Sequence, residues 1–267
     1  MLDLRYTRPE QLEHALALFT EDPDAQPLSG GQTLLPVLRA RLAAPSRLVD
    51  LGRLPELKGI TREGDLLHIG AAETHAAVAA DATVRVAIPA LAQLAGGIGD
   101  PQVRHRGTIG GSIANNDPAA CYPSAMLALG ASIVTSQRSV SAADFFTGLF
   151  ATALQPGEII VRVAIPACAS ARYVKLANPA SRFALVGVFH AQTASGHRLA
   201  VTGAGTGVFR WTEGERLLDS GGHADALTDA ALDQNRFTAD LHGSAEYRRH
   251  LVRVAAKRAL ALGPVAA

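Results

Sequence analysis

The stretch "DPQVRHRGTIGGSIANNDPAACYPSAMLALGA", residues 100 to 131, has two adjacent glycines at its centre and a group of polar side chains around them. Thr108 precedes the glycines, and Ser112 and the run 115–117 follow them, ahead of an apolar, helix-like segment. A surface turn does not need so many polar groups. We therefore interpret this stretch as a ligand-binding loop that leads into a buried helix.

An earlier glycine loop, "SGGQT" at residues 29–33, lies between a predicted strand and a predicted helix. It is the first glycine loop of the chain, and the loop around Gly110 and Gly111 is the second. Glycines let the backbone approach an anion closely, and free N–H groups at the start of a helix can bind it. "GTIGGS" at 107–112 offers a second set of N–H groups beside the hydroxyls of Thr108 and Ser112. A single Gly-Gly pair is usually a tight turn, but two such loops could hold one pyrophosphate from both sides.

Composition limits the class of protein. The chain has 267 residues, of which 48% are hydrophobic and 18% charged, enough for a sizeable core and two or more domains. Its net charge of +1 argues against nucleic acid and anionic membranes as partners. We expect no membrane span and a cytoplasmic location, because no apolar run reaches about 18 residues and the N-terminus lacks the apolar centre of a signal peptide.

Metal sites are not expected in this chain. Its two cysteines, Cys121 and Cys168, lie far apart, and the nine histidines form no cluster with ligand spacing. The chain therefore cannot hold an iron–sulfur cluster by itself.

Apolar spacing gives a coarse order of elements. A helix over residues 9–19, with Pro9 in its first turn, opens the fold. Residues 26–52 predict strand, glycine turn, helix and strand, a unit that favours parallel pairing. Residues 60–71 predict an antiparallel hairpin about Glu63 and Gly64. A strand over 158–166 closes this region.

The last hundred residues differ in texture. The small-residue segment 167–171 is the linker candidate. Beyond it, residues 183–193, 197–205 and 208–211 predict three antiparallel strands. The final helix starts after Ser244, a predicted N-cap.

In chain order, "LSGGQTLLPVLRARLAAPSRLVDLGRLPELKGI" (28–60), "IGDPQVRHRGTIGGSIANNDPAACYPSAMLALGA" (98–131) and "AEYRRHLVRVAAKRAL" (245–260) resemble the medium, FAD-binding subunit of the molybdenum hydroxylases. This is the family of xanthine dehydrogenase and aerobic carbon monoxide dehydrogenase, and the resemblance covers nearly the whole chain. It implies an α+β fold of the PCMH or vanillyl-alcohol-oxidase type. Two α/β subdomains, 1–57 and 58–168, would hold FAD between them, followed by a C-terminal domain, 169–267, of antiparallel sheet and helices.

The resemblance also implies the cofactor-binding residues. From one side, the pyrophosphate would be held by Gly30, Gly31, Gln32 and Thr33. From the other side, it would be held by Thr108, Gly110, Gly111 and Ser112. Ser29, Leu34 and Ile109 would also contact the cofactor. Asn115 would also contact the cofactor, and Asp117 would lie near the ribityl chain.

Four further positions concern the flavin. Lys175 would lie at the polar edge of the isoalloxazine ring, where a cation stabilises negative charge. Ile160 and Phe183 would pack on the ring, with ordinary core packing as the alternative. Cys121 stands where many relatives have an acidic residue, "DPAAD" against "DPAAC" here. Because cysteine is a poor acceptor, that contact would be lost or pass to Asp117 or a water.

The resemblance implies an electron-transfer subunit without catalytic residues of its own. In such a complex a large molybdopterin subunit oxidises the substrate, and a small subunit relays electrons through two [2Fe–2S] clusters. This chain's FAD then delivers them to an external acceptor, in a dimer of heterotrimers. Two alternatives stay open: a stand-alone flavin oxidase of the same fold, and an interaction module that has lost its cofactor.

Overall fold

A small parallel sheet begins the chain in the computed structural model, which describes residues 4–263. Its strands are β1 (Arg5–Thr7), β2 (Ala25–Leu28) and β3 (Arg47–Asp50), in the order β1-β3-β2 with both pairs parallel. Helix α1 (Leu12–Glu21) connects β1 to β2, and α2 (Leu34–Arg39) connects β2 to β3. The predicted parallel strand–turn–helix–strand unit is therefore confirmed.

The expected start of the chain needs two corrections. Strand β1 precedes α1, so a helix does not open the fold. The helix begins at Leu12, which leaves Pro9 ahead of it rather than in its first turn. Strand β1 is short and exposes Arg5 and Tyr6, so it lacks the apolar alternation that reveals a strand in sequence.

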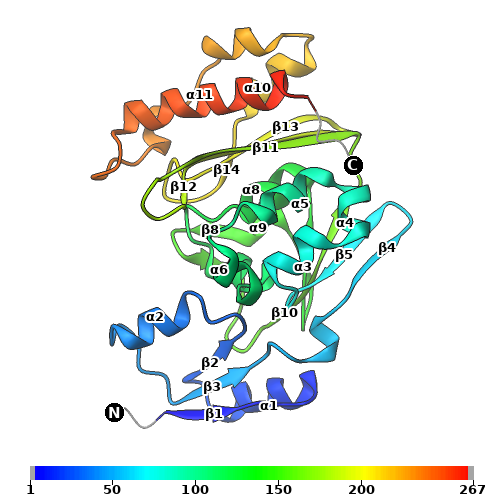
Figure 1. Ribbon diagram of the computed structural model, residues 1–267, viewed down its shortest axis with the longest axis vertical. Helices are drawn as coiled ribbons and strands as arrows, with labels where there is room; N and C mark the ends of the chain where they lie inside the picture. The colour runs from blue at the N-terminus through cyan, green and yellow to red at the C-terminus, as the bar shows by residue number, and fades with distance from the viewer. Residues whose placement is uncertain (1–3, 264–267) are drawn as a thin grey trace.

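The second sheet is antiparallel and lies in the middle of the molecule (Figure 1). Its order is β4-β5-β10-β6-β7, formed by β4 (Ile60–Glu63), β5 (Leu66–Gly70), β10 (Ile160–Pro166), β6 (Ser132–Thr135) and β7 (Ser139–Ser141). The hairpin about Glu63 and Gly64 is confirmed by the β4–β5 pairing. A smaller hairpin consists of β8 (Phe146–Gly148) and β9 (Ala151–Thr152).

Short helices fill the segment between β5 and β6. They are α3 (His75–Ala80), α4 (Ala82–Ala87), α5 (Pro89–Gly96), α6 (Pro101–Arg106), α7 (Ile109–Asn115) and α8 (Tyr122–Leu129), with α9 (Ala142–Phe145) after β7. Every residue of α8 is buried. A helix that is apolar all round belongs in a core, and α8 packs against strands β12 and β13 of the next sheet.

The C-terminal sheet has four strands instead of the predicted three: β11 (Ser170–Ala177), β12 (Ala184–Thr193), β13 (Gly196–Thr202) and β14 (Phe209–Arg210), antiparallel in chain order. Strand β11 begins inside the expected linker 167–171, because the small residues there pair with the far end of β12. Helices α10 (Thr212–Asp219) and α11 (Ala245–Ala261) follow, with 3₁₀ turns at Pro55–Leu57, Ala224–Thr228 and Gln234–Arg236.

The two faces of this sheet serve two cores. Val186 and Val188 of β12 belong to a cluster with Leu199, Trp211 and Val252, under α11. Phe189 and Ala191 of the same strand belong instead to the central cluster that contains α8. The α+β class is confirmed, and the division at 1–57, 58–168 and 169–267 stays a prediction.

Helix α11 is attached to the sheet at its first turn. The Ser244 hydroxyl accepts a hydrogen bond from Tyr247 N, 3.1 Å, which confirms the predicted N-cap. Arg248 is buried, and its guanidinium donates to the carbonyl oxygens of Leu185 (2.9 Å) and Gly203 (2.6 Å) and to Asp240 Oδ2 (2.6 Å). One side chain thus connects α11 with β12 and with the turn after β13.

Replacing this arginine should weaken the C-terminal unit. We expect Arg248→Ala to lower the free energy of unfolding by about 3 kcal/mol, because two buried carbonyl groups lose their donor. Urea unfolding followed by circular dichroism measures the change. Arg258→Ala, an exposed arginine on the same helix, is the control and should stay within about 0.5 kcal/mol of the parent. Equal effects in both variants would contradict this role.

Candidate functional site

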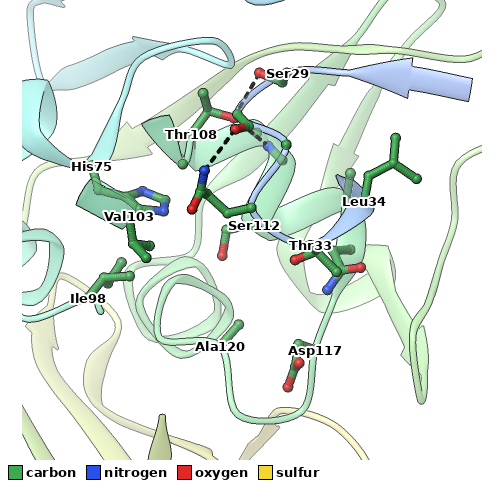
Figure 2. A pocket seen from close by; sticks show the side chains of 18 of the residues that line it. Ser29, Thr33, Leu34, His75, Ile98, Val103, Thr108, Ser112, Asp117 and Ala120 are labelled. Carbon is green, nitrogen blue, oxygen red and sulfur yellow. Dashed lines mark hydrogen bonds between the residues drawn. The ribbon is translucent and has the colours of Figure 1, made fainter. Parts of the chain in front are cut away.

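A cavity of about 700 Å³ lies between the β2–α2 loop, the α6–α7 segment and the β11–β12 turn. This volume is within the range of about 300–1,000 Å³ typical of cofactor and small-molecule sites. Figure 2 shows His75, Ile98 and Val103 on one side of it and Thr33 and Leu34 on the other. Most of its exposed surface is apolar, and its polar lining includes the two glycine loops.

The first glycine loop keeps its backbone donors available. Among residues 4–263, the N–H groups from Gly30 to Leu34 donate to no protein acceptor. Gly31 adopts φ +72°, a left-handed conformation that suits glycine. Consecutive unpaired N–H groups at the edge of a cavity form an anion-binding concavity.

Gly30 has a different task, because it touches the second loop. A Cβ atom on Gly30 would lie 2.7 Å from the Cα of Gly107 and closer still to the Arg106 carbonyl oxygen. The Ser29 and Thr108 hydroxyl oxygens, 3.0 Å apart, add a hydrogen bond between the same loops. Segments far apart in the sequence therefore meet at one wall of the cavity.

The second loop does not offer the N–H groups expected from its sequence. Ile109 N donates to Glu73 O (3.0 Å), Gly110 N to Ala71 O (2.9 Å) and Gly111 N to Thr108 Oγ1 (3.1 Å). Thr108 is the N-cap of α7, so the N–H groups at the start of this helix already have acceptors within the protein. Gly111 and the side chains of Thr108 and Ser112 are the parts of this loop that line the cavity and lie free to face a ligand there.

The glycines of this loop differ in what surrounds them. A Cβ atom on Gly110 would lie 2.7 Å from the Ala71 carbonyl oxygen, so Gly110 is required for packing against the strand-end of β5. At Gly111 the nearest atom is Thr108 Oγ1, 2.9 Å away, and it belongs to a side chain. A side chain at Gly111, at the cavity wall, would therefore press on the Thr108 hydroxyl that caps α7 rather than on backbone.

The predicted site residues, apart from Ile109, line this one cavity: Ser29, Gly30, Gly31, Gln32, Thr33, Leu34, Thr108, Gly110, Gly111, Ser112, Asn115, Asp117, Cys121, Ile160, Lys175 and Phe183. Ile109 is fully buried in the central core and is absent from the lining. Its helical spacing to Ile113 explains this, because residues i and i+4 share a face of α7 that points into the core.

The predicted residues beyond the loops have definite surroundings. Asp117 Oδ1 accepts from Ala119 N (2.8 Å), a turn that shapes its own segment. Lys175 Nζ donates to the carbonyl of Gly97 (3.1 Å) at the C-terminus of α5, where a cation is favoured. Phe183 is 51% exposed, which excludes core packing, whereas Ile160 and Cys121 are buried at the cavity wall.

A neighbouring residue, Asn116, holds the second loop in shape. It adopts a left-handed conformation at the end of α7, and its side-chain amide donates to Gly148 O (2.9 Å) and Ala151 O (2.8 Å). The β8–β9 hairpin is thereby fixed to the wall of the cavity.

His75 lines the cavity and was not identified from the sequence, where it stands in an alanine-rich run without a motif. It is 5% exposed, and burial lowers its pKa to about 4, with a smaller contribution from the nearby Arg104 charge. Its Nδ1 atom has no hydrogen-bond partner among the described residues. His75 is therefore neutral at pH 7 and presents a polar ring to the cavity.

The carboxylate of Glu158, also in the wall, forms an ion pair within the protein. Burial would raise the pKa of its carboxyl, but hydrogen bonds from Arg138 and Thr135 outweigh this and lower it. The Arg138 Nε–Glu158 Oε1 distance is 3.1 Å and the Thr135 Oγ1–Glu158 Oε1 distance is 2.6 Å. The carboxylate therefore stays ionised while its charge is taken up by Arg138.

Residues 2–168 match the family model described as the FAD binding domain in molybdopterin dehydrogenase. The chain is 34% identical to the nicotine 6-hydroxylase medium subunit of Paenarthrobacter nicotinovorans, over 96% of each chain. It is 35% identical to the carbon monoxide dehydrogenase medium chain of Hydrogenophaga pseudoflava, over 96% of this chain and 95% of that one.

Solved structures give the same picture. A chain of the Cu,Mo-CO dehydrogenase superposes with a TM-score of 0.90 at 32% identity, covering 98% of each chain. A chain of quinoline 2-oxidoreductase from Pseudomonas putida 86 gives 0.89 at 32% identity, covering 97% of this chain and 96% of that one. Within residues 4–263, no helix is long and apolar enough to span a membrane, and no His, Cys, Asp and Glu side chains gather in a group fit for a metal ion.

Filling the space beside Gly111 should block the ligand without unfolding the chain. We expect Gly111→Val to weaken FAD binding at least about tenfold, or by ~1.4 kcal/mol, because the new side chain enters the cavity. Fluorescence titration of FAD into the deflavinated chain measures this. Gly96→Ala is the control, since its Cβ atom would meet only Ala79 Cβ, at 3.8 Å. Unchanged affinity in Gly111→Val would place the ligand elsewhere.

The burial of His75 predicts a pH dependence. Because its folded pKa is about 4 and its unfolded pKa about 6.5, the unfolded state binds the proton first as the pH falls. Stability should therefore be complete above pH 6.5 and decline by about 3 kcal/mol between pH 6.5 and 4 on account of this group. His190, buried beside His197, has a pKa lowered to about 4 as well and adds a similar decline.

Replacing His75 tests that assignment. We expect the unfolding free energy of His75→Gln to fall by roughly half as much as that of the parent over this pH range, since His190 still titrates. Urea unfolding at a series of pH values measures both curves. Identical pH slopes in parent and variant would show that His75 does not contribute.

Proposed function

The chain belongs to the family of FAD-binding domains in molybdopterin dehydrogenases, and on that premise we propose that it is an electron-transfer subunit of a molybdenum hydroxylase. FAD is its cofactor, and the enzymes of its relatives are oxidoreductases. In the proposed complex, electrons from partner [2Fe–2S] clusters pass through the FAD bound to this chain and reach an external acceptor.

The observation that carries the proposal is the single cavity in which the two glycine loops meet. Its volume of about 700 Å³ suits a dinucleotide cofactor, and its wall contains the unpaired N–H groups from Gly30 to Leu34. We propose that these groups bind the pyrophosphate from one side. The hydroxyls of Thr108 and Ser112 would bind it from the other side, with Gly111 allowing the close approach.

The other lining residues would position the rest of the cofactor. Asn115 and Asp117 would bind the ribityl chain, and Ile160 would pack on the ring. FAD supplies the redox chemistry, since it can take up and give off electrons one or two at a time. Lys175 would favour negative charge on the ring, and the exposed Phe183 would shield the mouth of the cavity from water.

The C-terminal residues favour electron transfer over a stand-alone oxidase. Of the described residues after Pro166, those that line the cavity are Lys175 and the turn 180–183. The rest form a sheet that packs on α8 with one face and on α11 with the other. A flavin oxidase needs a separate domain that covers the ring and builds a substrate pocket. Here the described residues after Pro166 pack into the two cores instead.

A module without cofactor is the weaker alternative. Its support is the departure at Cys121, which lies buried at the cavity wall beside Tyr173. A protein that has lost its ligand has no reason to keep consecutive unpaired N–H groups around an open cavity. Binding of FAD explains why they are kept.

The proposal extends to assembly. We infer that the chain works in a complex with a small [2Fe–2S] subunit and a large molybdopterin subunit, as a dimer of heterotrimers in the cytoplasm. The support is the naming of its relatives, one as the medium chain of carbon monoxide dehydrogenase and another as subunit alpha of the 6-hydroxypseudooxynicotine dehydrogenase complex.

Electron flow separates these functions. The FAD-loaded chain alone should stay oxidised with purines, aldehydes, carbon monoxide or N-heterocycles, since the described residues after Pro166 add only Lys175 and the turn 180–183 to the cavity. Its flavin absorbance should bleach when the reduced [2Fe–2S] subunit is added. Stopped-flow absorbance on the chain alone, on the pair and on the full complex with substrate measures each step.

Each other outcome favours a rival. Rapid bleaching by an organic substrate in the isolated chain would favour the stand-alone oxidase. No bleaching in the complete complex, with its partners shown to be reduced, would favour the interaction module.

A further inference from the structure

We propose that a second, smaller cavity on this chain binds a phosphate group, either as the free ion or on a small phosphate ester. It has a volume of about 270 Å³ and lies behind the wall of the first cavity. Ser29, Ala72 and Thr108 line both cavities, so the hydrogen bond between the Ser29 and Thr108 hydroxyls separates them. The remaining lining comes from the ends of β1, β3 and α6, from Lys58 after the 3₁₀ turn Pro55–Leu57 and from Thr74 ahead of α3.

Positive charge is concentrated in this second cavity. Arg8, Arg53, Lys58 and Arg106 all line it, with His105 beside them. Within the part of the chain that the structure describes, none of the three arginines nor the lysine forms an ion pair with a carboxylate. All four residues are exposed, and Lys58 Nζ donates to the carbonyl oxygen of Ala72, so the positive potential of this cavity comes chiefly from the three arginines.

The carboxylate in the lining, Asp50, is already engaged. Its Oδ1 accepts from Gly52 N at 2.9 Å, and its Oδ2 accepts from the Tyr6 hydroxyl. That hydrogen bond raises the pKa of Tyr6, which keeps the hydroxyl protonated as a donor. Asp50 therefore shapes the cavity and leaves most of the positive charge uncompensated.

A phosphate group fits this cavity in charge, donors and size. Arginine side chains present paired N–H donors that match the geometry of phosphate oxygens, and lysine adds a point charge. The hydroxyls of Ser29, Thr74 and Thr108 supply further hydrogen bonds at the same wall. The volume is well under half that of the first cavity, which favours a phosphate or small ester over a second dinucleotide.

Because the two cavities share a wall, an anion bound in the second would change the affinity of the first for FAD. A phosphate there would lie on the other side of the Ser29–Thr108 pair from the loop that we propose to hold the FAD pyrophosphate. Repulsion between the two anions would weaken both, and linkage requires each to lower the affinity of the other by the same factor. This coupling rests on the proposed pyrophosphate position, whereas phosphate binding itself does not.

The test is calorimetric titration of the FAD-loaded chain, at low ionic strength in a phosphate-free buffer, with inorganic phosphate and separately with glycerol 3-phosphate. Bound FAD keeps the first cavity filled, so phosphate cannot bind at its glycine loops. We expect saturable one-to-one binding of at least one probe, and the probe that binds identifies a free ion or an ester. Titrating FAD into deflavinated chain with and without phosphate then measures the coupling.

The double variant Arg53→Gln/Arg106→Gln should weaken phosphate binding at least about tenfold. Arg258→Gln is the matched control, because it removes an exposed positive charge from α11 at the opposite end of the molecule (Figure 1), and it should bind as the parent does. Arg8→Gln gives the same comparison if the double variant fails to fold.

No saturable binding up to about 10 mM of either probe would overturn the proposal. Equal weakening in the double variant and in Arg258→Gln would overturn it too, since it would indicate a response to net charge. Phosphate binding without any effect on FAD affinity would leave this site standing and contradict the proposed pyrophosphate position.

Discussion

The cavity depends on the contact between Gly30 and the backbone of Arg106 and Gly107, where no side-chain atom can fit. It joins the parallel sheet of the first fifty residues to the helices between β5 and β6 of the central sheet. The cavity exists because these two parts meet at one wall and diverge on either side of it. Any substitution that separates the loops would open that wall and move the donors of residues 30–34 away from the hydroxyls of Thr108 and Ser112.

The loops that look alike in sequence divide their tasks. The first leaves its backbone N–H groups unpaired, and the second satisfies its own through Ala71, Glu73 and the cap of Thr108. The second loop is therefore a rigid surface, against which the first can hold a ligand. In the cavity wall, the negative charge of Glu158 is balanced by its ion pair with Arg138. Positive charge collects instead behind the wall, around Arg53 and Arg106.

Local signals account for what could be predicted from the sequence. The strand–turn–helix–strand unit, the hairpin at Gly64 and the cap at Ser244 each depend on a few neighbouring residues, and the structure has all of them. The resemblance brought distant positions together that periodicity could not, such as Lys175 with the glycine loops. Strand β11 was not predicted because its first residues, Ser170 and Ala171, look like part of a linker. Their pairing with the far end of β12 joins residues about twenty positions apart and leaves no local signal. The use of the second loop's N–H groups and the burial of His75 likewise depend on partners elsewhere in the chain.

Helix α8 lies in the central cluster and packs against β12 and β13, so this one core extends from the central sheet to the C-terminal sheet. The family match ends at residue 168, but the apolar contacts do not end there: Phe189, Ala191 and Ala200 complete the same cluster from the other side. A fragment cut at that point would expose one face of α8 to water and strip the third sheet of its support. The recognisable cofactor-binding segment is thus shorter than the packed core to which it belongs, and exchanging C-terminal units between relatives would require matching the surface of α8 as well.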